Sequence, residues 1–127
     1  MTMLRLMGER DELGIVEDQI GTPTSAASVS DAILHGMRVG LTGTHHWTDA
    51  GVASWYDFAH AIREHLRQSG IKGGSCRLRP IPTEAYPTPA RRPACSLLSK
   101  ESFRQATGLT GDAWRDTLRK ALESRGE

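Results

Sequence analysis

The feature that most constrains the fold is a dense run of proline in the carboxy-terminal half. Residues 82–93 read PTEAYPTPARRP and hold prolines at positions 82, 87, 89 and 93. Proline lacks a backbone donor and fixes φ at about −65°, so neither a regular helix nor a central strand tolerates this density. We expect residues 82–93 to form an extended, partly polyproline arm. Such an arm presents Tyr86, Arg91 and Arg92 with little conformational entropy left to lose.

The clearest helix signal precedes this arm. Ser54 and Asp57 match the S-x-x-[DE] capping box, and glycines at 70, 73 and 74 provide the stop. Between these signals, one apolar face is expected to be buried, formed by Trp55, Phe58, Ala59, Ile62 and Leu66. Residues 77–81 then alternate polar and apolar side chains, which predicts a strand, and Pro80 restricts that strand to an edge.

Weaker signals predict the remaining elements. A helix is expected from Met3 to about Leu13, stopped by Gly14, followed by a brief strand with Ile15 and Val16. A second helix is expected over 26–39, capped by Thr24 or Ser25, with an apolar face of Val29, Ile33 and Met37. Residues 44–47, THHW, favour a short β run. Two last helices are expected, one capped by Ser99 and ending near Thr107, the other capped by Asp112 with Trp114, Leu118, Ala121 and Leu122 on one face. The alternation predicts an α/β or α+β unit.

Composition excludes several classes of function. The 127 residues suit one domain, and a net charge of +1 provides no field that would attract nucleic acid or a membrane surface. Cys76 and Cys95 lie far apart outside any CxxC pattern, which favours reduced thiols in a cytoplasmic protein. Met1 to Leu13 has no apolar run that is long enough for a signal peptide or a membrane span.

Four blocks, in this order, carry a resemblance to a known family. They are DQIGTPT (18–24), SWYDFA (54–59), YPTPARRP (86–93) and a final helix that opens on Trp114. In this order they resemble dTDP-4-dehydrorhamnose reductases, which are extended short-chain dehydrogenases, and the similarity covers nearly the whole chain. The resemblance implies a single partial domain over 1–127, namely the carboxy-terminal substrate-binding lobe without the Rossmann core. It also implies that the opening residues are the interior of a family helix, so that the chain is a shortened one.

The resemblance also defines what this sequence lacks. Family members use NADPH or NADH to reduce dTDP-4-dehydro-L-rhamnose to dTDP-L-rhamnose, and a Tyr-x-x-x-Lys pair transfers the proton. Here Tyr56 is followed four residues later by His60, and Tyr86 by Ala90. No glycine-rich turn stands between a strand and a helix, since Gly73 and Gly74 precede a predicted strand. We therefore expect no catalytic residue, no bound cofactor and no turnover by this chain alone.

Five residues are candidates for binding a dTDP-hexose. By resemblance, Arg91 or Arg92 contacts the diphosphate, for which a guanidinium fork is suited; the alternative is an ion pair with a carboxylate of another lobe. Tyr86 could stack on a base or sugar, or instead hold the arm on the core. Gln19 and Thr24 could line the cleft, although a turn and a helix cap explain them nearly as well.

Other candidate chemistry has a simpler explanation. His45, His46 and Asp49 do not suit a metal site, because adjacent histidines on a strand point to opposite faces, and Cys95 is expected to be a small buried hydrophobe. Two classes of function stay open. One is part of a reductase, completed by a separate Rossmann-lobe chain or self-associating through an apolar face to which Met3, Leu4, Leu6 and Met7 contribute. The other is a non-catalytic binding or regulatory module of the same fold.

Overall fold

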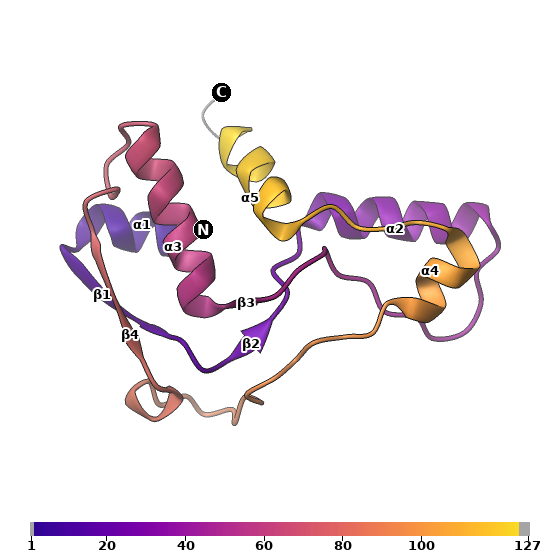
Figure 1. Ribbon diagram of the computed structural model, residues 1–127, viewed down its shortest axis with the longest axis horizontal. Coiled ribbons are helices and arrows are strands. Elements are labelled where there is room, and N and C mark those ends of the chain that lie inside the picture. Colours follow the sequence, from indigo (N-terminus) through magenta and orange to yellow (C-terminus); the bar gives the residue numbers. More distant parts are fainter. Residues whose placement is uncertain (1, 125–127) are drawn as a thin grey trace. The chain divides into compact units, whose positions relative to one another are not determined.

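A computed structural model describes residues 2–124 of the chain (Figure 1). The residues form two compact units, each built from two separate segments. The first unit comprises Met1–Gly21 and Ala53–Ser96, and the second comprises Thr22–Val52 and Leu97–Glu127. The expectation of one partial domain stays a prediction, because compactness alone does not decide whether the units fold together.

The first unit is organised around two parallel strands. β1 (Glu12–Val16) pairs with β4 (Arg77–Ile81), from Glu12 opposite Arg77 to Val16 opposite Ile81. Leu13, Ile15, Leu78 and Ile81 are buried, while Glu12 forms ion pairs with Arg77 and Arg79 on exposed side chains. Pro80 lies in β4 as predicted, and a two-stranded sheet leaves each strand one free edge that needs no donor.

The predicted first helix is wrong at its carboxy-terminal end. α1 spans Thr2–Glu9, and Leu13 belongs to β1 instead of a helix stopped by Gly14. Pairing with β4, more than sixty residues away in sequence, extends this segment, which local helix signals do not reveal. Met7 is buried, and Met3, Leu4 and Leu6 are half-buried, so α1 packs most of its apolar surface within the unit.

α3 (Trp55–Gln68) covers the strands and confirms the predicted capping box. The Ser54 hydroxyl accepts from the Asp57 amide at 3.0 Å, and the Asp57 carboxylate accepts from the Ser54 amide at 2.8 Å. Ala59, Ile62 and Leu66 are buried as expected, and α3 contacts α1, β1 and β4. The inclusion of Trp55 in the buried face was wrong, because its side chain is 50% exposed at the helix start.

Gly73 and Gly74 serve packing in this unit. A Cβ on Gly74 would lie 2.6 Å from the Arg67 Cα, and Gly73 has a φ of +105°. The glycine pair therefore lets the loop approach two backbones, Gly73 that of α1 at Met7 and Gly74 that of α3 at Arg67. Beyond the loop and β4, the chain forms the 3-10 turn η1 (Thr83–Ala85) and then the irregular arm that runs past residue 93.

The second unit contains α2 (Ala26–Arg38), α4 (Glu101–Thr107) and α5 (Trp114–Glu123). Ser25 is the α2 cap: its hydroxyl accepts from the Ser28 amide at 3.1 Å, which selects Ser25 over Thr24. The unit buries Ala32, Phe103, Trp114, Leu118 and Leu122. In contrast, the predicted apolar face of α2 is not buried; Val29, Ile33 and Met37 are 37%, 58% and 72% exposed.

Two predicted caps and one predicted strand do not occur in this unit. Lys100 and Ala113 are the cap residues of α4 and α5, and neither side chain accepts a capping hydrogen bond. The Asp112 carboxylate instead forms an ion pair with the Lys120 ammonium group at 2.9 Å, which raises the pKa of Lys120. The THHW run over 44–47 is irregular, since no described strand pairs with it. The α/β class itself is confirmed, with the small β2 (Ile20–Gly21) and β3 (Ala53–Ser54) pair completing the strands.

Candidate functional site

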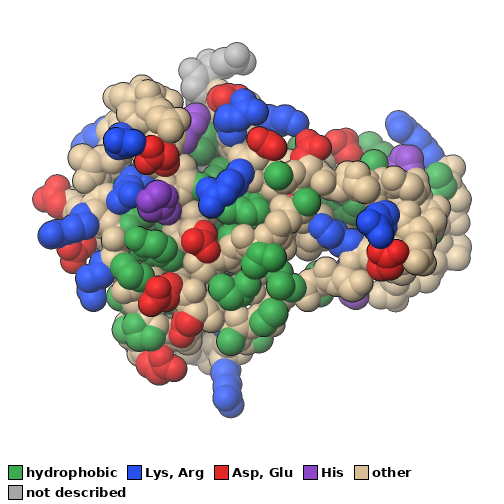
Figure 2. Space-filling view, in the orientation of Figure 1, with side chains coloured by type: hydrophobic (Ala, Val, Ile, Leu, Met, Phe, Trp, Pro, Cys, Tyr) green, Lys and Arg blue, Asp and Glu red, His purple; other side chains and the backbone are tan. Residues whose placement is uncertain are grey.

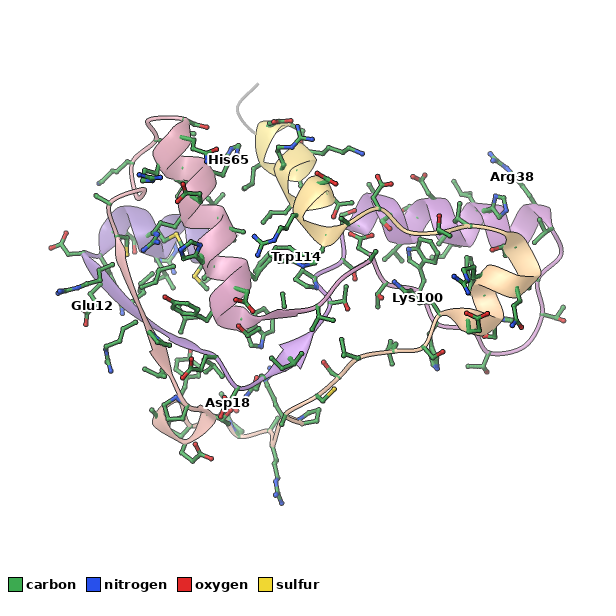
Figure 3. The ribbon with its side chains drawn as sticks, in the orientation of Figure 1. Glu12, Asp18, Arg38, His65, Lys100 and Trp114 are labelled. Carbon is green, nitrogen blue, oxygen red and sulfur yellow. The ribbon has the colours of Figure 1, made fainter. Side chains whose placement is uncertain are left out.

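The proline-rich arm leaves the first unit where the two parallel strands end. Asp18 lies two residues beyond β1, and Thr83 lies two residues beyond β4. The Thr83 hydroxyl donates to the Asp18 carboxylate at 2.6 Å, and the Thr83 amide donates to it at 3.0 Å. These hydrogen bonds lower the pKa of Asp18, because both stabilise the ionised carboxylate. Figure 3 marks Asp18 beside the chain that follows β4.

The far end of the arm returns to the same part of the first unit. The Ile20 amide donates to the Ala94 carbonyl at 2.8 Å, and the Ser96 amide donates to the Ile20 carbonyl at 2.8 Å. The Ser96 hydroxyl donates to that carbonyl as well, at 3.1 Å. Residues 83–94 therefore form a loop whose two ends are both attached to the segment 18–20.

The loop lines a shallow, open groove of about 530 Å³. Its walls are Asp18, Thr83, Glu84, Ala94 and the arm residues 86–92, which include Tyr86, Arg91 and Arg92. Three of the five predicted substrate residues thus lie on one concave surface. Neither Arg91 nor Arg92 forms an ion pair with a carboxylate of residues 2–124, so both guanidinium groups are available to an anionic ligand.

Tyr86 does not hold the arm on the core. Its side chain is 60% exposed, and residues 84–99 are all exposed. Cys95 is also exposed, so its interpretation as a buried hydrophobe was wrong; the buried thiol is Cys76, whose pKa is raised by burial. Among residues 2–124, hydrogen bonds rather than apolar packing therefore anchor the arm.

The other two predicted residues contribute to structure around the groove or elsewhere. Gln19 donates its side-chain amide to the Thr83 hydroxyl at 3.1 Å and does not line the groove. Thr24 belongs to the second unit, where its hydroxyl donates to the Thr22 carbonyl at 3.0 Å and accepts from the Asp49 amide at 3.3 Å. These contacts agree with the turn interpretation of Thr24, and binding by Gln19 and Thr24 remains a prediction.

Sequence reasoning missed Asp18, Thr83 and Glu84 as groove residues. Asp18 and Thr83 are 65 positions apart and meet only through the parallel register of β1 and β4. The available signal was a carboxylate two residues after one strand and a threonine two residues after another. Pairing the two predicted strands in parallel would have brought these side chains together.

In the predicted THHW run, His45 has hydrogen-bond partners on both ring nitrogens. The His45 ring nitrogens lie 3.2 Å from the Ser102 hydroxyl and 3.0 Å from the Thr42 carbonyl. No group of three or more potential metal ligands occurs among residues 2–124.

Acidic and basic side chains are interspersed over the face drawn in Figure 2. In the part of the chain that the structure describes, no helix has the length and apolarity needed to cross a membrane.

Solved structures share this fold. A dTDP-4-dehydrorhamnose reductase from Clostridium acetobutylicum matches 99% of the chain with a TM-score of 0.88 and 34% identity, although the match covers only 43% of that protein. The same enzyme from Bacillus anthracis, solved in complex with NADP, matches 97% of the chain with a TM-score of 0.85 and 31% identity, again over 42% of its length. Both matches lie in the carboxy-terminal part of the reductase.

Sequence comparison gives the same assignment. The dTDP-4-dehydrorhamnose reductase of Escherichia coli K12 is 40% identical over 126 residues, and that of Burkholderia thailandensis is 42% identical over 127. These matches cover 95% and 90% of the chain, which spans 42% of the length of each relative. Residues 1–126 match the family described as RmlD substrate binding domain. The chain therefore belongs to the RmlD substrate-binding domain family.

Proposed function

We propose that this chain is the nucleotide-sugar-binding part of a reductase that converts dTDP-4-dehydro-L-rhamnose to dTDP-L-rhamnose. The observation that carries the proposal is the groove inside the arm, where Arg91 and Arg92 stand without a carboxylate partner among the described residues. Relatives that carry this reductase name match nearly the whole chain.

The groove suits a diphosphate that carries a sugar and a base. Two adjacent guanidinium groups provide forked donors for paired phosphate oxygens, and a charge-assisted contact contributes about 1.5–3 kcal/mol. Tyr86, at 60% exposure, offers a ring face for stacking, and Glu84 can accept from sugar hydroxyls. We assign substrate contacts to Tyr86, Arg91 and Arg92, and a supporting position to Gln19.

The reduction itself requires groups that this sequence does not contain. It has no glycine-rich turn that leads from a strand into a helix, and no Tyr-x-x-x-Lys pair. We propose that NADPH and the proton-transferring pair belong to a nucleotide-binding lobe, in the same or another polypeptide. The chain by itself then binds dTDP-sugars but neither binds nor oxidises NADPH.

Calorimetric titration with dTDP tests this function. We expect Arg91→Ala and Arg92→Ala each to weaken dTDP binding by about tenfold to a hundredfold, which corresponds to the loss of one charge-assisted contact. Arg38→Ala is the matched control, because Arg38 is an exposed arginine on α2 outside the groove. A titration with NADPH should give no binding heat.

Two results would contradict the proposal. One is dTDP binding that is equally strong in the Arg91, Arg92 and Arg38 variants, which would place the nucleotide elsewhere. The other is NADPH oxidation by the purified chain with dTDP-4-dehydrorhamnose, after removal of host reductase, which would show that the chemistry resides in this chain.

A further inference from the structure

Both ends of the arm are attached to the same short segment, residues 18–20. The Asp18 carboxylate accepts hydrogen bonds from the hydroxyl and the backbone amide of Thr83, at 2.6 and 3.0 Å. The Ile20 amide donates to the Ala94 carbonyl, and the Ile20 carbonyl accepts from the Ser96 amide. The segment between the two attachments, 84–93, is exposed along its length. Apolar burial therefore does not fix this loop, and the attachments at its ends must do so.

The near attachment is a short chain of hydrogen bonds that joins Gln19, Thr83 and Asp18. The Thr83 hydroxyl donates to Asp18 and also accepts from the Gln19 side-chain amide at 3.1 Å. This chain of donors fixes the orientation of both side chains. Parallel pairing of β1 with β4 places the two partners at the same end of the sheet, so the attachment has a rigid base.

The far attachment depends on a residue without a side chain. A Cβ on Gly21 would lie 2.9 Å from the Ser96 hydroxyl oxygen, which donates to the Ile20 carbonyl. A larger residue at position 21 would therefore force the Ser96 hydroxyl away from the Ile20 carbonyl, leaving the two backbone hydrogen bonds of Ile20 to hold the far end. Gly21 also pairs with Ala53 in the β2–β3 ladder, which holds residues 20–21 beside the two residues that directly precede α3.

We propose that residues 18–21, here called the staple, close the arm into a preformed loop and act as positioning residues for Tyr86, Arg91 and Arg92. The choice of ligand rests on the proposed function, while loop closure does not. A closed loop presents its two arginines in one arrangement before the nucleotide arrives. Ordering of the loop is then completed during folding and does not weaken binding.

Asp18→Ala tests the staple, with Glu17→Ala as the matched control. Glu17 is the neighbouring exposed carboxylate; its backbone amide donates to the Ile81 carbonyl, and its carboxylate has no hydrogen bond or ion pair with residues 2–124. Trypsin reports loop order, because it can cleave between Arg91 and Arg92, while Pro93 protects the next bond. We expect Asp18→Ala to speed this cleavage and to weaken dTDP binding, each by roughly two- to tenfold, as the ordering of one or two side chains implies. Glu17→Ala should match the wild type.

A conservative pair at Thr83 separates positioning from general loss of structure. Thr83→Ser keeps both donors to Asp18 and should show the slow cleavage and tight dTDP binding of the wild type. Thr83→Val loses the hydroxyl and should resemble Asp18→Ala. Thermal unfolding of all four variants provides the check on folding. This pair also decides the case in which Asp18→Ala does not fold.

The outcomes distinguish the staple from the proposed function. If Asp18→Ala and Thr83→Val leave both cleavage and dTDP affinity at wild-type values, the staple is overturned. If cleavage accelerates while dTDP affinity stays constant, loop closure stands and the positioning role is overturned. If the wild type binds no dTDP but its variants are still cleaved faster, the staple as a loop closure is supported and the proposed function is contradicted.

Discussion

At the residue scale, Asp49 is the most unusual side chain of the second unit. It is fully buried, and one carboxylate oxygen accepts from the Thr117 hydroxyl at 2.6 Å and from the Ser25 amide at 3.1 Å. The other oxygen has no partner among residues 2–124. Lys100 donates to the carbonyls of Thr48 and Asp49, which fixes the loop that carries the carboxylate. Asp49 therefore joins the start of α2 to α5 within this unit.

Loss of the Thr117 hydroxyl should destabilise the second unit. Thr117→Val retains the shape of the side chain but removes the shortest donor to a buried carboxylate, so we expect the free energy of unfolding to fall by about 1.5–3 kcal/mol. Urea denaturation followed by circular dichroism measures the change. Thr117→Ser keeps the hydroxyl and serves as control. A valine variant no less stable than the serine variant would show that Asp49 is satisfied by other groups.

At the element scale, helix starts divide the chain into capped and uncapped helices. Ser25 and Ser54 accept hydrogen bonds from the third helical residue of α2 and α3, and both starts were recognisable from local sequence. α4 and α5 begin at Lys100 and Ala113 without side-chain caps. Their predicted caps failed because Asp112 pairs with Lys120 instead, and because the Ser99 hydroxyl reaches only the Glu101 amide at 3.5 Å.

The missing cap of α5 predicts a stabilising substitution. Ala113 is exposed and extended, with φ −62° and ψ 136°, which is the conformation that a capping serine adopts. Ala113→Ser should therefore raise the free energy of unfolding by about 0.5–1 kcal/mol. Urea denaturation again gives the value, and Ala113→Val, which adds volume without an acceptor, should not stabilise. Equal stability of the serine and alanine proteins would mean that the α5 start is already solvated as well as a cap would allow.

Local signals were sufficient where an element is determined by its own residues. Spacing and proline content alone predicted the capping box of α3, the residue range of α2 and the irregular proline-rich arm. The start of β1 and the groove partners Asp18 and Thr83 did not, because they depend on pairing between residues about 65 positions apart. The two groove arginines could therefore be predicted from the sequence, whereas Asp18 and its partner Thr83 could not.

At the scale of the whole molecule, burial is uneven. Val29, Ile33 and Met37 recur every four residues on α2, and all three are exposed together with Leu34. By contrast, α1, which was expected to provide the exposed apolar surface, buries Met7 and half-buries its other large apolar side chains, Met3, Leu4 and Leu6. The chain also spans only 42% of the length of its reductase relatives. We propose that the α2 face packs against the part of those relatives that this chain does not span, which the family resemblance predicts to be a nucleotide-binding lobe.

An α2 face without that lobe should make the isolated chain self-associate. Interfaces between domains cover on the order of 600–1,500 Å², and monomers rarely expose apolar patches beyond a few hundred Å². We expect sedimentation velocity to show concentration-dependent association, which Ile33→Glu reduces while thermal stability stays within about 0.5 kcal/mol of the wild type. Ile71→Glu is the control, since Ile71 is 50% exposed but lies outside α2.

The decisive experiment adds the amino-terminal lobe of a reductase relative as a separate protein. If the α2 face binds that lobe, the mixture should form a heterodimer that Ile33→Glu weakens and Ile71→Glu does not, because only the first substitution places a charge in the contact. A wild-type chain that stays monomeric at every concentration, binds no apolar dye and ignores the lobe would contradict the inference. Its surface would then be adapted to independent existence, and a non-catalytic regulatory role would become the better account of a nucleotide-sugar groove without catalytic groups.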